Sequence, residues 1–176
     1  MQEQLPALRS LLAGETVTTE GRYVRLGEVT LDWPPETAPR VYAAAEGPKT
    51  LRLAGSVADG VVLDSGHTVE EIAAAVQQVQ DGRAEAERTG RADIVAYVRT
   101  AFGPGARERV ARVIGERPDA AHRALAGSIA DVAEGVARFH AAGVDDVVLL
   151  PTDDEDLHPF LAAVGQVAAA GRGAVS

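Results

Sequence analysis

Apolar and polar positions alternate along the chain with two different periods, and each change of period marks a predicted element. Val41–Ala45 is a short apolar run, and Val61–Leu63 is apolar at every position, as in strands that are buried on both faces. Between these runs, Thr50–Val57 has apolar residues with helical spacing at Leu51, Ala54 and Val57. This order predicts a strand, a helix and a second strand, which form one βαβ unit of a parallel sheet.

The second half of the chain repeats the pattern of a strand followed by a helix. Ile94–Phe102 and Val147–Leu150 are apolar runs, and they predict a third and a fourth strand. Segments with helical periodicity follow the later strands, and their expected starts are Thr68, Ala106, Ser128 and Asp156. Thr68 and Glu71 have the spacing of a capping box. The chain is therefore predicted to be an α/β protein with four parallel βα units.

A helix and a β-hairpin are expected before these units. Gln4–Ala13 has the apolar spacing of a short helix, and Val17–Thr19 and Tyr23–Leu26 flank a turn that contains glycine. A proline-rich connector follows the hairpin. We expect a single domain over residues 1–176, with the helix, hairpin and connector in 1–40, the four βα units in 41–170 and a loose tail in 171–176.

Composition and charge argue against several classes of protein. The net charge of −9 disfavours nucleic-acid binding, because a phosphate backbone requires a basic surface. No apolar run is long enough to span a membrane, and the start of the chain lacks the pattern of a signal peptide, so we expect no membrane association. Cysteine is absent, which excludes disulfides and thiolate metal sites and fits a cytoplasmic protein.

The turn Glu46-Gly47-Pro48-Lys49 is the first candidate site. Pro48 suits the first turn of a helix, where its missing N–H would have no helical partner. The start of a helix carries unpaired N–H groups and a partial positive charge, so it can hold an anion such as phosphate. Gly47 permits the close approach of a ligand, and Lys49, the only lysine, adds a positive charge. The alternative is a plain strand-to-helix turn that binds nothing.

The loop that follows Leu63 is the second candidate site, because ligands collect at the carboxyl ends of parallel strands. Its candidate residues are Asp64, Ser65 and His67. The four histidines of the chain have no helical or zinc-type spacing, so we expect no metal site. No G-x-G-x-x-G motif follows a strand, and no nucleophile elbow supports a Ser-His-Asp triad, so the sequence assigns no catalytic residue.

Two stretches of the chain resemble a known family. They read LLAGETVTTEGRYVRL and VYAAAEGPKTLRLAGSVADGVVL, and both are similar to the luciferase-like monooxygenases, which are flavin- and deazaflavin-dependent oxidoreductases of the bacterial luciferase type. In that family the turn of small residues, glycine and proline lies beside the phosphate of FMN or of the deazaflavin coenzyme F-420. The resemblance therefore implies that a cofactor phosphate would lie at Ala44, Ala45, Glu46, Gly47 and Pro48. Glu46 departs from the family pattern, since its carboxylate would repel a phosphate.

The same resemblance implies the fold. It extends from about Leu5 to Ala168 and corresponds to the second half of a (β/α)8 TIM barrel, because a complete barrel needs eight βα units. An open half-barrel would expose two strand edges and an apolar concave face. We therefore expect a homodimer, in which a second copy completes the sheet.

Three functions are compatible with these expectations. The first is a truncated oxidoreductase that transfers a hydride or activates oxygen through FMN or coenzyme F-420, acting on a small-molecule substrate. The second is a non-catalytic relative, either a flavin- or phosphate-binding module or a structural dimer with no cofactor bound. The third is one half of a split enzyme that requires a separately encoded partner.

Overall fold

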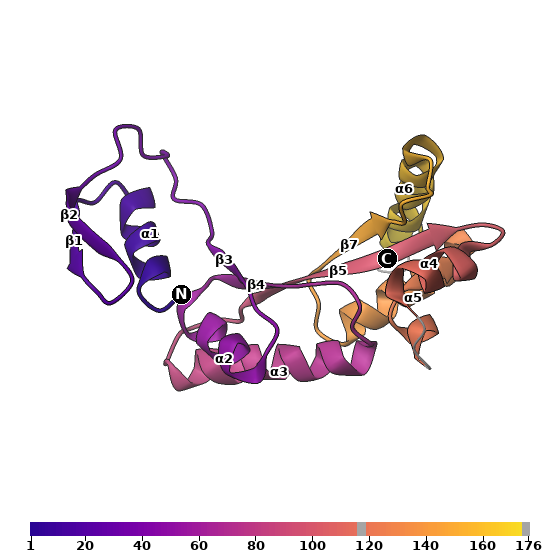
Figure 1. Cartoon of the computed structure of the whole chain (residues 1–176), viewed down its shortest axis with the longest axis horizontal. Coiled ribbons are helices and arrows are strands. Elements are labelled where there is room, and N and C mark those ends of the chain that lie inside the picture. The colour runs from indigo at the N-terminus through magenta and orange to yellow at the C-terminus, as the bar shows by residue number, and fades with distance from the viewer. Residues whose placement is uncertain (116–118, 174–176) are drawn as a thin grey trace. The chain divides into compact units, whose positions relative to one another are not determined.

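The structure is a computed structural model that describes residues 1–115 and 119–173 (Figure 1). The described chain divides into two compact units, and β4 (Gly60–Leu63) and α3 (Val69–Glu85) contribute to both. The first unit contains Met1–Val61 and Gln77–Asp93, and the second contains Val62–Val76 and Ile94–Ser176. Each unit is described by itself below.

The first unit begins with α1 (Gln4–Leu12) and an antiparallel hairpin of β1 (Val17–Glu20) and β2 (Arg25–Val29). The predicted helix and hairpin are therefore confirmed, but β2 begins at Arg25 and not at Tyr23. The reason is that the carboxylate of Glu3 accepts hydrogen bonds from the backbone N–H groups of the three residues before β2, at 2.8 to 3.1 Å. These groups are consequently unavailable to a strand ladder.

The first unit continues with β3 (Tyr42–Ala44) and α2 (Pro48–Val57), and α2 packs closely on the second half of α3 (Val69–Glu85). Two glycines permit this approach. A Cβ atom at Gly55 would lie 2.0 Å from the carbonyl oxygen of Val79, and one at Gly82 would lie 2.0 Å from that of Arg52. The backbones of the two helices therefore touch at positions where no larger side chain fits.

The main sheet has the strand order β3-β4-β5-β6, and β7 also pairs with β5. Its remaining strands are β4 (Gly60–Leu63), β5 (Asp93–Phe102), β6 (Leu125–Gly127) and β7 (Asp146–Pro151). In the second unit β5 pairs in parallel with β7 from Val95 to Thr100 and with β6 from Thr100 to Phe102. The predicted α/β fold with four parallel strands is confirmed, whereas β6 was not predicted.

The core of the second unit lies on one face of β5. Burial alternates along this strand, and every second residue from Ile94 to Thr100 is buried. The helices of this unit are α4 (Ala106–Ile114), α5 (Ile129–Ala141) and α6 (Leu157–Gly173), together with the short 3₁₀ helix η1 (Ala120–His122). Ser128 and Asp131 form a reciprocal capping box at the start of α5.

The expectation for the C-terminal tail is partly wrong. The predicted loose tail begins at Gly171, but α6 continues to Gly173, so the first three residues of that segment are helical. Residues 174–176 lie outside the described residues. Over the two ranges that the structure describes, no helix has the length and apolar character needed to cross a bilayer.

Candidate functional site

The first candidate site is the turn between β3 and α2. Gly47 is the N-cap of α2, with an extended backbone at φ −76° and ψ 151°, and Pro48 occupies the first helical position as predicted. The carbonyl oxygen of Gly47 accepts hydrogen bonds from the N–H of Leu51 at 2.9 Å and from the hydroxyl of Thr50 at 2.8 Å. The helix therefore begins with a fixed first turn.

The first turn of α2 has free backbone donors, and there is space beside Gly47 for a ligand. The N–H groups of Lys49 and Thr50 lie in the first helical turn, where no intrahelical acceptor exists. A Cβ atom at Gly47 would meet only the Thr50 hydroxyl, at 3.5 Å, so the chain itself does not require glycine there. Glu46 and Lys49 are exposed, and within residues 1–115 and 119–173 neither makes an ion pair. A ligand that approaches this turn would therefore meet two unpaired donors, one cationic side chain and one carboxylate.

Of the two predicted alanines at this turn, one faces solvent and the other does not. Ala44 is the last residue of β3 and is exposed, whereas Ala45 is buried, with 7% of its surface accessible. Ala45 can therefore contribute its backbone, but its methyl group is buried. Only Ala44 presents its side chain to a ligand.

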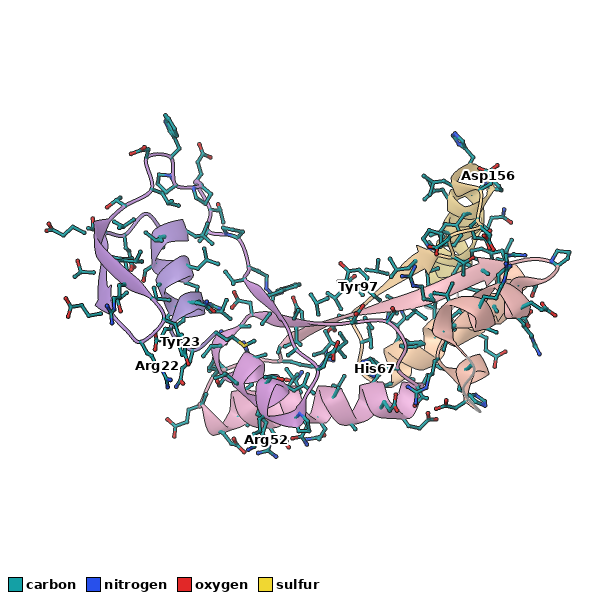
Figure 2. All side chains as sticks on the ribbon, viewed as in Figure 1. Arg22, Tyr23, Arg52, His67, Tyr97 and Asp156 are labelled. Atoms are coloured by element: carbon teal, nitrogen blue, oxygen red, sulfur yellow. The ribbon has the colours of Figure 1, made fainter. Side chains whose placement is uncertain are left out.

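The second candidate site is the loop between β4 and α3. Asp64 accepts a hydrogen bond from the N–H of Ser65 at 2.7 Å, and Gly66 adopts a left-handed backbone with φ +91°. His67 places its Nδ1 atom 3.5 Å from the carboxylate of Glu71, one helical turn further along (Figure 2). The predicted capping box is confirmed, because Thr68 and Glu71 exchange hydrogen bonds at 3.0 and 3.2 Å.

Arg123 forms hydrogen bonds to this loop, and the sequence analysis did not predict it as a site residue. Its guanidinium donates to the carbonyl oxygen of Gly66 at 2.7 Å, to both carboxylate oxygens of Glu71 at 2.6 and 2.8 Å, and to Asp119 at 2.6 Å. Only 11% of the Arg123 side chain is exposed. The hydrogen bonds from Arg123 lower the pKa of Glu71 to about 2. No local pattern around Arg123 signals its bonds to Gly66 and Glu71, because these two partners lie 57 and 52 residues away.

The predicted site residues thus fall into two groups. Ala44 to Lys49 belong to the first compact unit, and Asp64, Ser65 and His67 belong to the second. The structure describes each group as a separate local site. Among the described residues, no cluster of three or more histidine, aspartate or glutamate side chains could hold a metal ion.

Comparison with known proteins gives one family match and several curated relatives. The family model described as luciferase-like monooxygenase matches residues 1–123. A 5,10-methylenetetrahydromethanopterin reductase from Methanolobus tindarius is 36% identical over 97 residues, which cover 54% of this chain and 29% of that protein. An F420-dependent glucose-6-phosphate dehydrogenase from Microbacterium testaceum is 32% identical over 106 residues, which cover 59% of this chain and 32% of that protein. The matched part is therefore about a third of the length of each relative.

Solved structures share the fold over nearly the whole chain. An F420-dependent secondary alcohol dehydrogenase in complex with an F420–acetone adduct superposes with a TM-score of 0.85 and 16% identity, covering 96% of this chain and 60% of that one. The coenzyme F420 dependent tetrahydromethanopterin reductase from Methanopyrus kandleri gives a TM-score of 0.70 and 19% identity, covering 91% and 59%. The present chain therefore corresponds to somewhat more than half of each longer fold.

Proposed function

Because the chain belongs to the luciferase-like monooxygenase family, we propose that it binds the phosphate of a deazaflavin or flavin cofactor at the turn between β3 and α2. The observation that carries this proposal is the open start of α2, where the N–H groups of Lys49 and Thr50 have no intrahelical acceptor. The side chain of Lys49 adds a positive charge beside them. An anion at this place would gain hydrogen bonds and charge neutralisation together.

The relatives favour coenzyme F-420 over FMN. The Microbacterium testaceum relative and the secondary alcohol dehydrogenase structure are both named as F420-dependent. FMN is named in a more distant structure, a riboflavin lyase with a TM-score of 0.57. A bound deazaflavin would supply hydride chemistry, and this chain would supply its binding and orientation. The proposed activity is therefore an F-420-dependent oxidoreduction of a small molecule, in a cytoplasmic setting that a cysteine-free sequence fits.

Glu46 favours a second candidate function, a non-catalytic relative that leaves the turn empty. Its exposed carboxylate directly precedes Gly47. The negative charge would repel a phosphate that approaches the N–H groups of Lys49 and Thr50, and so would weaken its binding. The chain spans 60% of the dehydrogenase that it superposes on, so an activity of that whole protein is a proposal for this chain. This candidate predicts a folded protein that ignores both cofactors.

A direct titration separates the two candidates. The purified chain is added to a fixed concentration of coenzyme F-420, and in parallel to FMN, and the fluorescence anisotropy of each cofactor is recorded. We expect saturable binding of F-420 that weakens as salt is added, because the contact is with a phosphate. Anisotropy that stays flat with both cofactors, for a chain with a cooperative thermal transition, would refute cofactor binding and support the non-catalytic relative.

A further inference from the structure

A cavity of about 410 Å³ lies in the second unit, where the start of α3, the short helix η1, strand β6 and the end of α5 meet. Its volume falls within the range of about 300–1,000 Å³ that is typical of small-molecule sites. None of the candidate residues from Ala44 to Lys49 or from Asp64 to His67 lines it. The cavity is therefore separate from both candidate sites described above.

The buried part of the cavity lining is apolar and closely packed. Leu125 of β6 and Phe139 of α5 line the cavity and expose only 5% and 3% of their surfaces. Gly135 permits α5 to approach β6, because a Cβ atom at this position would lie 2.3 Å from Cδ2 of Leu125. An apolar lining of this kind binds the hydrocarbon part of a ligand.

Two sides of the cavity are joined to each other by hydrogen bonds. Arg123, which directly follows His122, donates to both carboxylate oxygens of Glu71 at 2.6 and 2.8 Å. Glu71 is the neighbour of Glu70 in the first turn of α3. These bonds therefore fix the segment that carries His122 against the start of α3. Because these two sides are fixed before a ligand arrives, binding requires little further ordering of the chain.

Three polar side chains line the cavity, and they come from three elements: Glu70 from α3, His122 from η1 and Arg138 from α5. The pKa of Glu70 lies below its ordinary value, chiefly because its carboxylate accepts hydrogen bonds from its own N–H group and from Thr68. His122 and Arg138 lower this pKa further through their charges, so the three groups lie near one another. Within residues 1–115 and 119–173, however, Arg138 makes no ion pair and no side-chain hydrogen bond. The cavity thus presents a guanidinium and a carboxylate that do not pair directly.

We propose that this cavity, called here the α3–α5 cavity, binds the zwitterion of an apolar α-amino acid. The carboxylate of the ligand pairs with Arg138, and its ammonium group pairs with Glu70. The side chain of the ligand packs on Leu125 and Phe139, and His122 donates a further hydrogen bond to the carboxylate. This site does not depend on whether the turn before α2 holds a cofactor.

The two opposite charges in the cavity favour this class of ligand. A simple carboxylic acid would pair with Arg138 but would be repelled by Glu70, and a simple amine would pair with Glu70 but would be repelled by Arg138. A neutral apolar molecule would leave both charged groups without a partner. A molecule with both charges at one end and an apolar body at the other matches the whole lining. Leucine and phenylalanine have this structure.

The test is isothermal titration calorimetry of the full chain with L-phenylalanine. We expect saturable binding at one site per chain. N-Acetyl-L-phenylalanine lacks the ammonium charge and L-phenylalaninamide lacks the carboxylate, so each should bind at least about tenfold more weakly. L-Glutamate should also bind at least about tenfold more weakly, because its charged side chain would lie against the apolar lining.

Variants of the charged residues test the two ion pairs. Arg138→Gln and Glu70→Gln each remove one charge from the cavity and should weaken the binding of L-phenylalanine at least about tenfold. Arg112→Gln and Glu36→Gln are the matched controls, since both residues are exposed and neither lines the cavity. These two controls should leave the affinity unchanged.

A steric variant tests the place of binding without removing a charge. Ala73 is exposed on α3 and lines the cavity, whereas its neighbour Ala74 is exposed and does not. We expect Ala73→Trp to abolish binding and Ala74→Trp to preserve it. A wild-type chain with a cooperative thermal transition that shows no saturable binding would overturn the proposal. Equal affinities for L-phenylalanine and its N-acetyl derivative, or equal effects of Ala73→Trp and Ala74→Trp, would overturn it as well.

Discussion

Arg123 and Glu71 are joined by two hydrogen bonds, of 2.6 and 2.8 Å, in which the guanidinium donates to both oxygens of the carboxylate. The same carboxylate caps α3 through the N–H of Thr68 and lies 3.5 Å from Nδ1 of His67. The same guanidinium also donates to Gly66 at 2.7 Å. One ion pair thus connects the candidate loop, the start of a helix and the segment that contains Arg123.

The first prediction concerns pH. Because the hydrogen bonds from Arg123 lower the pKa of Glu71 from its ordinary value of 4.5 to about 2, the folded protein holds this carboxylate ionised. Its stabilising effect is therefore fully present above pH 4.5 and is lost as the pH falls toward 2. A carbon-detected NMR titration of the Glu71 carboxyl should give a midpoint near the lower value. A midpoint close to 4.5 would show that the ion pair does not form in solution.

The second prediction concerns the geometry of the pair. Arg123→Lys keeps the positive charge but cannot donate to Gly66, Glu71 and Asp119 at once, since an ammonium lacks the planar fork. We expect amide hydrogen exchange in residues 64–68 to accelerate by roughly tenfold or more at neutral pH. The same substitution at Arg112, which pairs with Asp154 at 2.9 Å and is 66% exposed, should leave that loop unchanged. Equal protection of the loop in both variants would contradict the role of Arg123.

Local features of this chain could be predicted from its sequence, whereas the long-range contacts of Arg123 could not. Capping boxes at Thr68 and Ser128, and the proline at the start of α2, are local signals, and the structure has all three. The bonds of Arg123 to Gly66 and Glu71 join residues 57 and 52 positions apart, so no window of a few turns contains both partners. Only the tertiary fold brings these residues together, which is why the hydrogen bonds from Arg123 to Gly66 and Glu71 were not predicted.

Two further differences have local causes. Strand β6 has three residues and is followed at once by the cap at Ser128, so it is too short for any periodicity to appear. The segment from Gly171 contains two glycines in three residues, which indicates a loop, yet α6 continues to Gly173. Helix propensity is a weak guide at the end of a long helix, because the turns before it are already formed.

The third prediction concerns the contact between α2 and α3. Gly55→Ala should destabilise the protein by about 3 kcal/mol, because the new methyl group would lie 2.0 Å from the backbone oxygen of Val79 and would force the helices apart. Thermal unfolding followed by circular dichroism measures the change. Gly165→Ala is the matched control, since no atom lies within 4 Å of its Cβ position in α6, and it should stabilise by up to about 1 kcal/mol. If Gly55→Ala were as stable as wild type, the close helix contact would be wrong.

The last prediction concerns Glu46, the residue that separates the two proposed functions. Its exposed carboxylate stands beside the unpaired donors of α2, so Glu46→Gln should strengthen the binding of coenzyme F-420 by about threefold to tenfold, as expected for one charge interaction at the surface. Lys49→Gln should weaken binding by a similar factor, because it removes the only cation of the turn. Both effects should shrink in high salt, which screens exposed charges.

Glu134→Gln provides the control for Glu46, since Glu134 is also exposed but lies in α5, a helix of the second compact unit. Removing its charge changes the net charge of the chain by the same amount, so a general effect on an anionic cofactor would appear equally in both variants. A gain confined to Glu46→Gln would place the cofactor phosphate at the turn. Equal gains in the two variants would mean that overall charge governs the affinity, and the anion site before α2 would then have to be abandoned.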